Sequence, residues 1–282
     1  MTNYTWVIGG GAGDIIRDFY WKGQYAALEE LKPEDTCDIH ILSHNPFVEE
    51  FFHWHPKTIQ LTVKSWGYVV PDEDEVKRKE FDIPLEGTYR ELPCSAKPVT
   101  FYPNPGDMQV LEFFDAVHEK YGTVGYCMSS IAAGDYDRTF PQDIKVLLEG
   151  LLDEKTDFRQ YINLAVGRNF KRGDRLEDVA SLGNWNVGMV DCLSLSGTCK
   201  LLEGAAGLIT CHSVLSMLAF LIHKPQLLLY PETVRQRHFL HPDMWSFGAS
   251  SPECVHCTFD DFEKNPQHYI DRFLTVLKEY KK

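Results

Sequence analysis

Short apolar runs alternate with helical patterns from the start of the chain. Runs of strand type occupy Tyr4–Ile8, Cys37–Leu42 and Thr58–Val63. Between them, apolar residues recur at helical spacing in Asp14–Leu31 and, over a shorter stretch, in Pro46–His53. This alternation predicts an α/β fold in which the strands are parallel.

A second α/β series follows an irregular stretch that runs from Trp66 to Pro105 and holds six prolines. Asp107–Tyr121 has the spacing of an amphipathic helix. The strands then expected are Thr123–Cys127, Tyr161–Val166, Val187–Val190 and Gly207–Cys211, and the helices are Pro141–Leu152, Arg175–Leu182, Leu193–Leu202 and Asp260–Tyr280. We therefore expect an N-terminal domain over residues 1–105 and a second domain over 106–265. A C-terminal helix over 266–282 is expected to pack back toward the first domain.

The composition is that of a soluble globular protein. The chain has 282 residues, of which 44% are hydrophobic and 24% charged, enough for two domains of ordinary size. No apolar stretch reaches the roughly 18 residues that a membrane span requires, and the first residues lack the features of a signal peptide. A cytoplasmic protein is expected. The net charge of −13 disfavours nucleic acid and anionic lipid as partners.

Eight cysteines are scattered along the chain. Most read as small buried hydrophobic residues in a reducing compartment. Cys254 and Cys257 form a CxxC pair around His256, but no second pair stands at the spacing of a zinc site. We expect neither a bound metal nor another cofactor.

A candidate anion site lies at Ser213, which directly follows the expected strand Gly207–Cys211. Ser213 is a good N-cap for the apolar helical pattern that begins at Val214. In a parallel sheet, the backbone N–H groups of such a helix lie beyond the carboxyl end of the strand, where ligands bind, and they suit a phosphate. An ordinary turn with a capping serine explains the same residues.

Three segments resemble glycosyltransferase family 9, the heptosyltransferase-like enzymes of GT-B fold. Gly9–Arg17 is similar to the family's N-terminal glycine loop, with its Gly-Asp pair before the first helix. Val124–Ser130, followed by Arg138 and Phe140-Pro141, is similar to the strand, loop, basic residue and helix that open the family's donor domain. Val190–Pro225 follows the family's order of aspartate turn, helix, strand, loop and helix. The resemblance implies two Rossmann-like domains facing each other across a cleft.

The resemblance also implies roles for individual residues. Asp14 matches the family's catalytic base, and the five small residues before it permit close approach of a ligand; the competing reading is that Asp14 only favours the N-terminus of the first helix. The residues expected to bind the donor are Gly11, Gly13, Ser129, Ser130, Arg138, Arg168, His212, Ser213 and Val214. One departure is clear. Where the family has Asp-Ser-Gly, this chain has His212-Ser213-Val214, so His212 either contacts the diphosphate or sugar or is a strand-end histidine held by a carbonyl.

The expected function is inverting transfer of a sugar from a nucleotide-diphosphate sugar to an acceptor hydroxyl. The acceptor stays open between a lipopolysaccharide core or other glycan, a protein side chain and a hydroxymethylated DNA base. Three alternatives remain: a non-catalytic nucleotide-sugar-binding protein, a pyruvyl-type transferase, and an NAD(P)-type Rossmann oxidoreductase. The last fits the glycines poorly, because G-x-G-x-x-G counted from Gly9 requires glycine where Asp14 stands.

Overall fold

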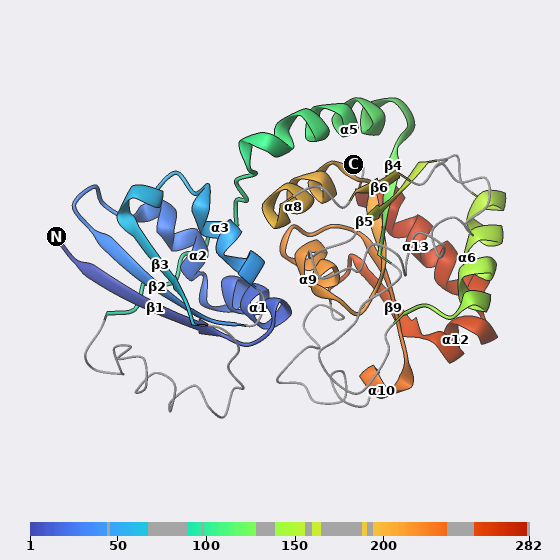
Figure 1. Ribbon diagram of the computed structural model, residues 1–282. Helices are drawn as coiled ribbons and strands as arrows, with labels where there is room; N and C mark the ends of the chain where they lie inside the picture. The colour runs from blue at the N-terminus through green and yellow to red at the C-terminus, as the bar shows by residue number, and fades with distance from the viewer. Residues whose placement is uncertain are drawn as a thin grey trace. The chain divides into compact units, whose positions relative to one another are not determined.

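The computed structural model describes residues 1–43, 46–66, 90–97, 99–127, 139–155, 160–164, 188–190, 194–235 and 251–280 (Figure 1). The chain divides into two compact units. The first comprises Met1–Gly106 with Ser194–Gly197, and the second comprises Asp107–Leu193 with Thr198–Lys282. The sequence analysis placed the boundary after residue 105. None of the helices described is both long and apolar enough to cross a bilayer.

The first unit is built on a three-stranded parallel sheet in the order β1-β2-β3. Its strands are β1 (Asn3–Gly9), β2 (Thr36–Leu42) and β3 (Leu61–Ser65). Its helices are α1 (Ala12–Lys22), α2 (Gln24–Ala27), α3 (Glu50–His53) and the 3₁₀ turns Leu28–Glu30, Pro46–Glu49, Thr58–Gln60 and Pro105–Asp107. Because all three strands run the same way, their carboxyl ends share one edge of the sheet.

Buried aromatic rings fill the core of this unit. Trp6 of β1 lies with its ring centroid 5.6 Å from that of Phe19 on α1 and 5.8 Å from that of Phe52 on α3. Phe19 in turn stacks on Tyr25 of α2 at 4.8 Å. Each of these side chains is at most 1% exposed. Contacts of this kind add to the large apolar area that each ring buries, so they fix α1, α2 and α3 against the sheet.

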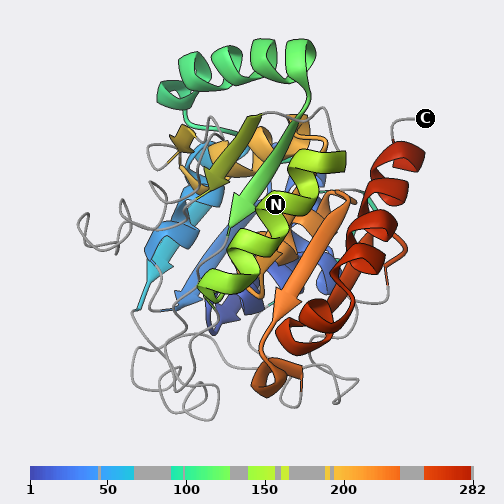
Figure 2. The same cartoon turned by 90° about the vertical axis from the view of Figure 1, so that its right-hand side faces the viewer.

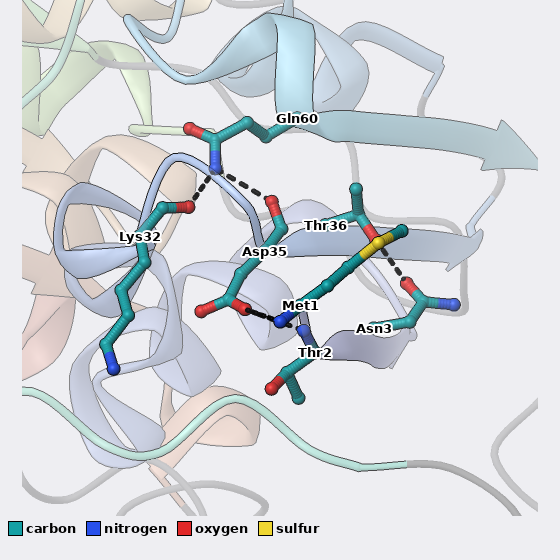
Figure 3. A network of polar contacts seen from close by, with 7 residues as sticks. All are labelled: Met1, Thr2, Asn3, Lys32, Asp35, Thr36 and Gln60. Atoms are coloured by element: carbon teal, nitrogen blue, oxygen red, sulfur yellow. Dashed lines mark hydrogen bonds and ion pairs between the residues drawn. The ribbon is translucent and has the colours of Figure 1, made fainter.

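A network of polar contacts joins the amino ends of the three strands (Figure 3). The Asp35 carboxylate accepts the backbone N–H of Thr2 at 2.7 Å, ahead of β1. Gln60, just before β3, donates to the carbonyls of Lys32 and Asp35 at 2.6 and 2.8 Å. These contacts connect the amino ends of the strands, at the edge of the sheet opposite the carboxyl ends.

Three expectations for the first unit need correction. The helix expected over Asp14–Leu31 breaks at Gly23, whose φ is +55° and where a Cβ atom would lie 2.4 Å from the carbonyl oxygen of Ser95. Residues 58–60 form a 3₁₀ turn, so the third strand begins at Leu61 rather than Thr58. The irregular stretch also suggested an uncertain strand near Val99–Tyr102, and none forms there. In the first two cases a tertiary contact or a turn, which periodicity does not reveal, decides the local conformation.

The second unit holds a six-stranded, wholly parallel sheet in the order β6-β5-β4-β7-β8-β9. Its strands are β4 (Thr123–Cys127), β5 (Gln160–Leu164), β6 (Gly188–Val190), β7 (Gly207–Cys211), β8 (Gln226–Tyr230) and β9 (Cys254–Thr258). Its helices are α5 (Met108–Tyr121), α6 (Gln142–Lys155), α8 (Leu195–Gly204), α9 (Val214–Leu221), α10 (Glu232–Val234), α12 (Phe259–Lys264) and α13 (Pro266–Tyr280). Counted along the chain within this unit, the order is 3-2-1-4-5-6, which is the Rossmann arrangement.

Helices cover both faces of this sheet. Figure 1 shows α8 and α9 on one side and α13 on the other, and Figure 2 shows α6 and α13 together in front of the strands. The strands β7 and β8 are buried along their whole length. This explains why both are mostly apolar and show no alternation of apolar and polar residues.

The closing helix also differs from the expectation. Asp260–Tyr280 is split at Asn265 into α12 and α13, and Pro266 starts the second helix, a position where proline is tolerated. Helix α13 packs against β8, β9 and α6, with Phe273 and Leu277 buried. These contacts belong to the second unit, and the expectation that this helix packs back toward the first domain stays a prediction. The helix expected at 175–182 falls outside the described residues.

Candidate functional site

Asp14 lies in the first turn of α1, directly after the glycine loop that joins β1 to this helix. Its Oδ2 atom accepts the backbone N–H of Gly11 at 2.9 Å, and the Asp14 N–H donates to the Gly11 carbonyl at 3.0 Å. Gly11 is the N-cap of α1, with extended backbone. Asp14 therefore satisfies a donor at the helix N-terminus, and a negative charge there is favourable.

Glycine is required at position 10 for this arrangement. Gly10 has φ of +96°, a conformation that other residues avoid. A Cβ atom at Gly10 would lie 2.9 Å from both the Cβ and the Oδ2 of Asp14. The loop is also anchored to the sheet, because the Gly10 N–H donates to the Leu42 carbonyl of β2 at 3.1 Å. The glycines thus fix where the carboxylate lies.

The loop supports both interpretations of Asp14 drawn from the sequence. The hydrogen bond to Gly11 shows that the residue has a capping role. The same contact holds a carboxylate at the carboxyl edge of a parallel sheet, among small residues, which is a suitable place for a general base. Gly13 lies within the first turn of α1 and is partly exposed.

The second unit has its topological switch point between β4 and β7. The chain proceeds from β4 to one side of the sheet through β5 and β6, and from β7 to the other through β8 and β9. The two strands pair in parallel, with Cys127 opposite Thr210. In open α/β sheets, ligands bind outside the carboxyl ends of the strands at this point.

Helix α9 begins directly beyond the carboxyl end of β7. Ser213 is its N-cap, with extended φ and ψ of −149° and 176°. The Ser216 hydroxyl donates to the Ser213 carbonyl at 2.7 Å and accepts the Ser213 N–H at 3.4 Å. No acidic side chain occupies the first turn of α9, so its positive end is not neutralised from within the helix.

The turn between β7 and α9 also contacts a buried hydroxyl group, that of Thr210. Thr210, fully buried, donates to the Cys211 carbonyl at 2.8 Å and lies 3.3 Å from the Ser213 hydroxyl. His212 is only 3% exposed, so its side chain is enclosed by the protein; Val214 is partly exposed. Thr210 and Ser216 were missed by the sequence analysis. The sequence feature that could have identified them is a hydroxyl-bearing residue three positions before and three positions after the N-cap serine.

The other predicted donor-binding residues, Ser129, Ser130, Arg138 and Arg168, lie outside the described residues, as does Arg172. In the sequence, Ser129 and Ser130 follow β4 by two and three residues. The pairing of β4 with β7 places the carboxyl end of β4 beside that of β7, and Ser213 follows the end of β7 by two residues. These roles stay predictions.

The CxxC pair lies within β9. Both thiols are buried, and burial raises the pKa of Cys254 to about 12 and that of Cys257 well above its ordinary value. A thiol must lose its proton to bind a metal. Among the described residues, no group of three potential ligands gathers. The pair fits the expectation of small buried hydrophobic residues.

Comparison with known proteins relates the chain to others through its structure. No protein-family model matches it, and no curated protein matches it in sequence. The ADP-heptose lipopolysaccharide heptosyltransferase II of E. coli is 13% identical, with a TM-score of 0.61 over 99% of this chain and 100% of that one. A glycosyltransferase family 9 protein of Veillonella parvula is 11% identical, with a TM-score of 0.61 over 99% of this chain and 97% of that one.

A third structure extends the pattern. The E. coli heptosyltransferase WaaC, solved with ADP, is 14% identical and has a TM-score of 0.50 over 94% of this chain and 98% of that one. The likeness covers nearly the full length of each protein and includes both units. With two parallel α/β units, the second in Rossmann order, the chain has the GT-B-like fold of the heptosyltransferases and glycosyltransferase family 9.

Proposed function

We propose that the protein is an inverting glycosyltransferase that moves a sugar from a nucleotide-diphosphate sugar to an acceptor hydroxyl. The observation that carries this proposal is the pairing of two features in one GT-B-like chain. At its switch point the second unit starts helix α9, whose first turn carries no acidic side chain, and the first unit holds Asp14 in the first turn of α1, directly after a glycine loop.

The donor's diphosphate is assigned to the carboxyl ends of β4 and β7. The first N–H groups of a helix have no intrahelical acceptor, and such groups bind phosphate; in α9 the third of them, that of Ser216, already donates to the Ser213 carbonyl at 3.2 Å, which leaves the first two for the donor. Ser213 adds a hydroxyl, and Ser129, Ser130, Arg138 and Arg168 are the further proposed ligands. One structural neighbour is named as an ADP-heptose heptosyltransferase, and another was solved with ADP. A sugar linked to an adenine nucleotide is therefore the first donor to test.

The chemistry assigns Asp14 the role of general base. The acceptor oxygen attacks the anomeric carbon of the sugar, while the bond from that carbon to the diphosphate oxygen breaks. Asp14 takes the proton of the attacking hydroxyl, and the nucleotide diphosphate leaves with the electron pair. The N-terminus of α9 and the proposed ligands Arg138 and Arg168 stabilise the charge that develops on the leaving group. We propose that no metal is needed.

A ligand panel tests the donor assignment. The protein is heated with ADP-, UDP-, GDP- and CMP-sugars, with ADP alone, and with NAD and NADP, each with EDTA and with Mg²⁺. A ligand that binds the folded state raises the melting temperature by mass action. We expect stabilisation by one class of nucleotide sugar, equally in EDTA. Stabilisation by NAD or NADP alone would favour the oxidoreductase instead.

The substitution Asp14→Asn tests the base. Asparagine can still accept the Gly11 N–H through its carbonyl oxygen but cannot take a proton, so we expect transfer to fall by about 10²- to 10⁴-fold with donor affinity unchanged. Asp18→Asn is the matched control: it lies one turn further along α1, where Asp18 pairs with Lys22 at 3.2 Å, and should transfer nearly as wild type. Near wild-type transfer by the Asp14 variant would refute the assignment.

A non-catalytic nucleotide-sugar-binding protein is the second candidate. It is favoured by His212, a buried residue that stands where the resemblance expects an aspartate. In that case the panel would show binding of a nucleotide sugar, while neither transfer nor donor hydrolysis would be detected with any acceptor class.

A further inference from the structure

His40 and Trp66 form a hydrogen-bonded pair near the carboxyl edge of the first unit's sheet. His40, on β2, is 5% exposed and lies in register between Val7 of β1 and Lys64 of β3. Trp66 directly follows β3. Its backbone N–H donates to the Ile41 carbonyl at 2.9 Å, and its indole Nε1–H donates to Nδ1 of His40 at 3.1 Å.

The protonation state of His40 follows from the chemistry of its partner. The indole N–H of Trp66 can only donate, so Nδ1 of His40 must hold a lone pair. The histidine is therefore neutral, with its proton on Nε2. A second proton would go onto Nδ1 and would place two N–H groups against each other. Protonation of His40 and the hydrogen bond to Trp66 are thus mutually exclusive.

A series of contacts connects this pair with the loop before Asp14. Trp66 packs, together with Val7, against the fully buried Leu42. The Leu42 carbonyl accepts the Gly10 N–H at 3.1 Å. The next residue of the loop, Gly11, donates to the Asp14 carboxylate. A shift of Trp66 would therefore act on the strand end that anchors the glycine loop.

We propose that His40 is a positioning residue that, while neutral, holds Trp66 against Leu42 and so supports the Asp14 loop, and that its protonation releases Trp66. The inference concerns regulation of the proposed site, but the pair and its titration do not depend on the protein being a glycosyltransferase. Among the described residues, the charged groups that act on His40 are Asp38 on β2 and Lys64 on β3; its neighbour on β1, Val7, carries no charge.

The surroundings of His40 set the pH at which Trp66 is released, and that pH lies below neutrality. Burial lowers the pKa of His40 below its ordinary value, Lys64 lowers it further, and Asp38 opposes them. The bond to Trp66 is then intact at neutral pH and is lost as the pH falls through the lowered pKa.

An NMR titration of the full chain, without nucleotide, tests the pair. The Trp66 indole ¹⁵N–¹H signal is assigned by its loss in Trp66→Phe, and the His40 ring is followed from pH 8 to 4.5. We expect the Nε2–H tautomer at neutral pH and one common midpoint for both signals, below 6.5. An Nδ1–H tautomer, or an indole signal constant through the titration of His40, would overturn the proposal.

The link to the loop has its own readout and control. The backbone amide signals of Gly10 and Gly11 should move with the same midpoint. His40→Gln keeps an acceptor for the indole through its carbonyl oxygen but cannot titrate, so in this variant the midpoint should vanish from the Trp66 and Gly10 signals. Loop signals that ignore the His40 midpoint in the wild type would refute the positioning role, whatever the outcome for sugar transfer.

Discussion

Gly10 shows how a single residue type fixes the position of a neighbouring carboxylate, that of Asp14. Gly10→Ala places a methyl group 2.9 Å from the Asp14 side chain at a φ of +96°. We expect a loss of about 1–3 kcal/mol in the free energy of unfolding, because strain and overlap add. Denaturant unfolding measures the loss, and sugar transfer should fall with it, since Asp14 must move.

Gly11→Ala is the matched control for that substitution. Gly11 has φ of −74°, and a Cβ there would lie 3.4 Å from Asp14 Oδ2, at the edge of ordinary contact. We expect a smaller loss, of about 0.5 kcal/mol, because alanine is a poorer N-cap than glycine but meets no strain here. Equal losses in the two variants would show that the loop is less constrained than these contacts indicate.

His55 makes the first unit sensitive to acid. Its side chain is 2% exposed, and its Nδ1 accepts the Lys57 N–H at 3.1 Å. Burial is the main cause that lowers the pKa to about 4 from an unfolded value of 6.5. The unfolded chain therefore gains a proton first as the pH falls. The stabilising contribution is complete above pH 6.5 and is lost toward pH 4, by about 3 kcal/mol in all.

His55→Asn isolates this contribution, because asparagine can still accept the Lys57 N–H but does not titrate. Between pH 7 and pH 4 the wild type should lose about 3 kcal/mol more of its unfolding free energy than the variant. Chemical unfolding at several pH values measures the difference. Parallel curves for the two proteins would mean that His55 titrates normally in the folded state.

At the scale of elements, the docking of α13 depends on Gly207 at the start of β7. A Cβ there would lie 2.6 Å from Leu277 Cδ2 of α13 and 3.0 Å from the Pro225 carbonyl oxygen. Gly207→Ala should therefore cost about 1–3 kcal/mol of unfolding free energy through overpacking. Gly150→Ala in α6 is the control, since nothing lies within 4 Å of its Cβ position, and it should stabilise by about 0.5–1 kcal/mol. Denaturant unfolding distinguishes the two signs.

Periodicity predicted the elements well wherever one pattern extended over a whole element. Thr123–Cys127 and Gly207–Cys211 are strands with the expected bounds, and Ser213 caps the helix that follows. It failed at Gly23 and Asn265, where one apolar pattern continues across a break. The cause of the first break, the Ser95 backbone beside Gly23, comes from a residue far along the chain.

At the scale of the whole molecule, the proposed donor site should be visible in hydrogen exchange. A nucleotide diphosphate bound at the switch point would satisfy N–H groups at the start of α9. We expect slower exchange over residues 211–217 and unchanged exchange around Asp35, at the amino edge of the other sheet. Protection near Asp35 in place of α9 would contradict the assignment. Exchange measured with and without ADP makes the test.

The sequence by itself determined the α/β class, the two series of strands, Asp14 on its glycine loop and Ser213 at a helix start, because all of these depend on local spacing and turn chemistry. It could not determine that β4 and β7 are neighbours, because strand order is set by contacts between residues more than eighty apart. It left open whether Asp14 caps the first helix, and it gave no sign that Trp66 bonds to His40. Those contacts follow from the path of the folded backbone, so only the tertiary structure decided them.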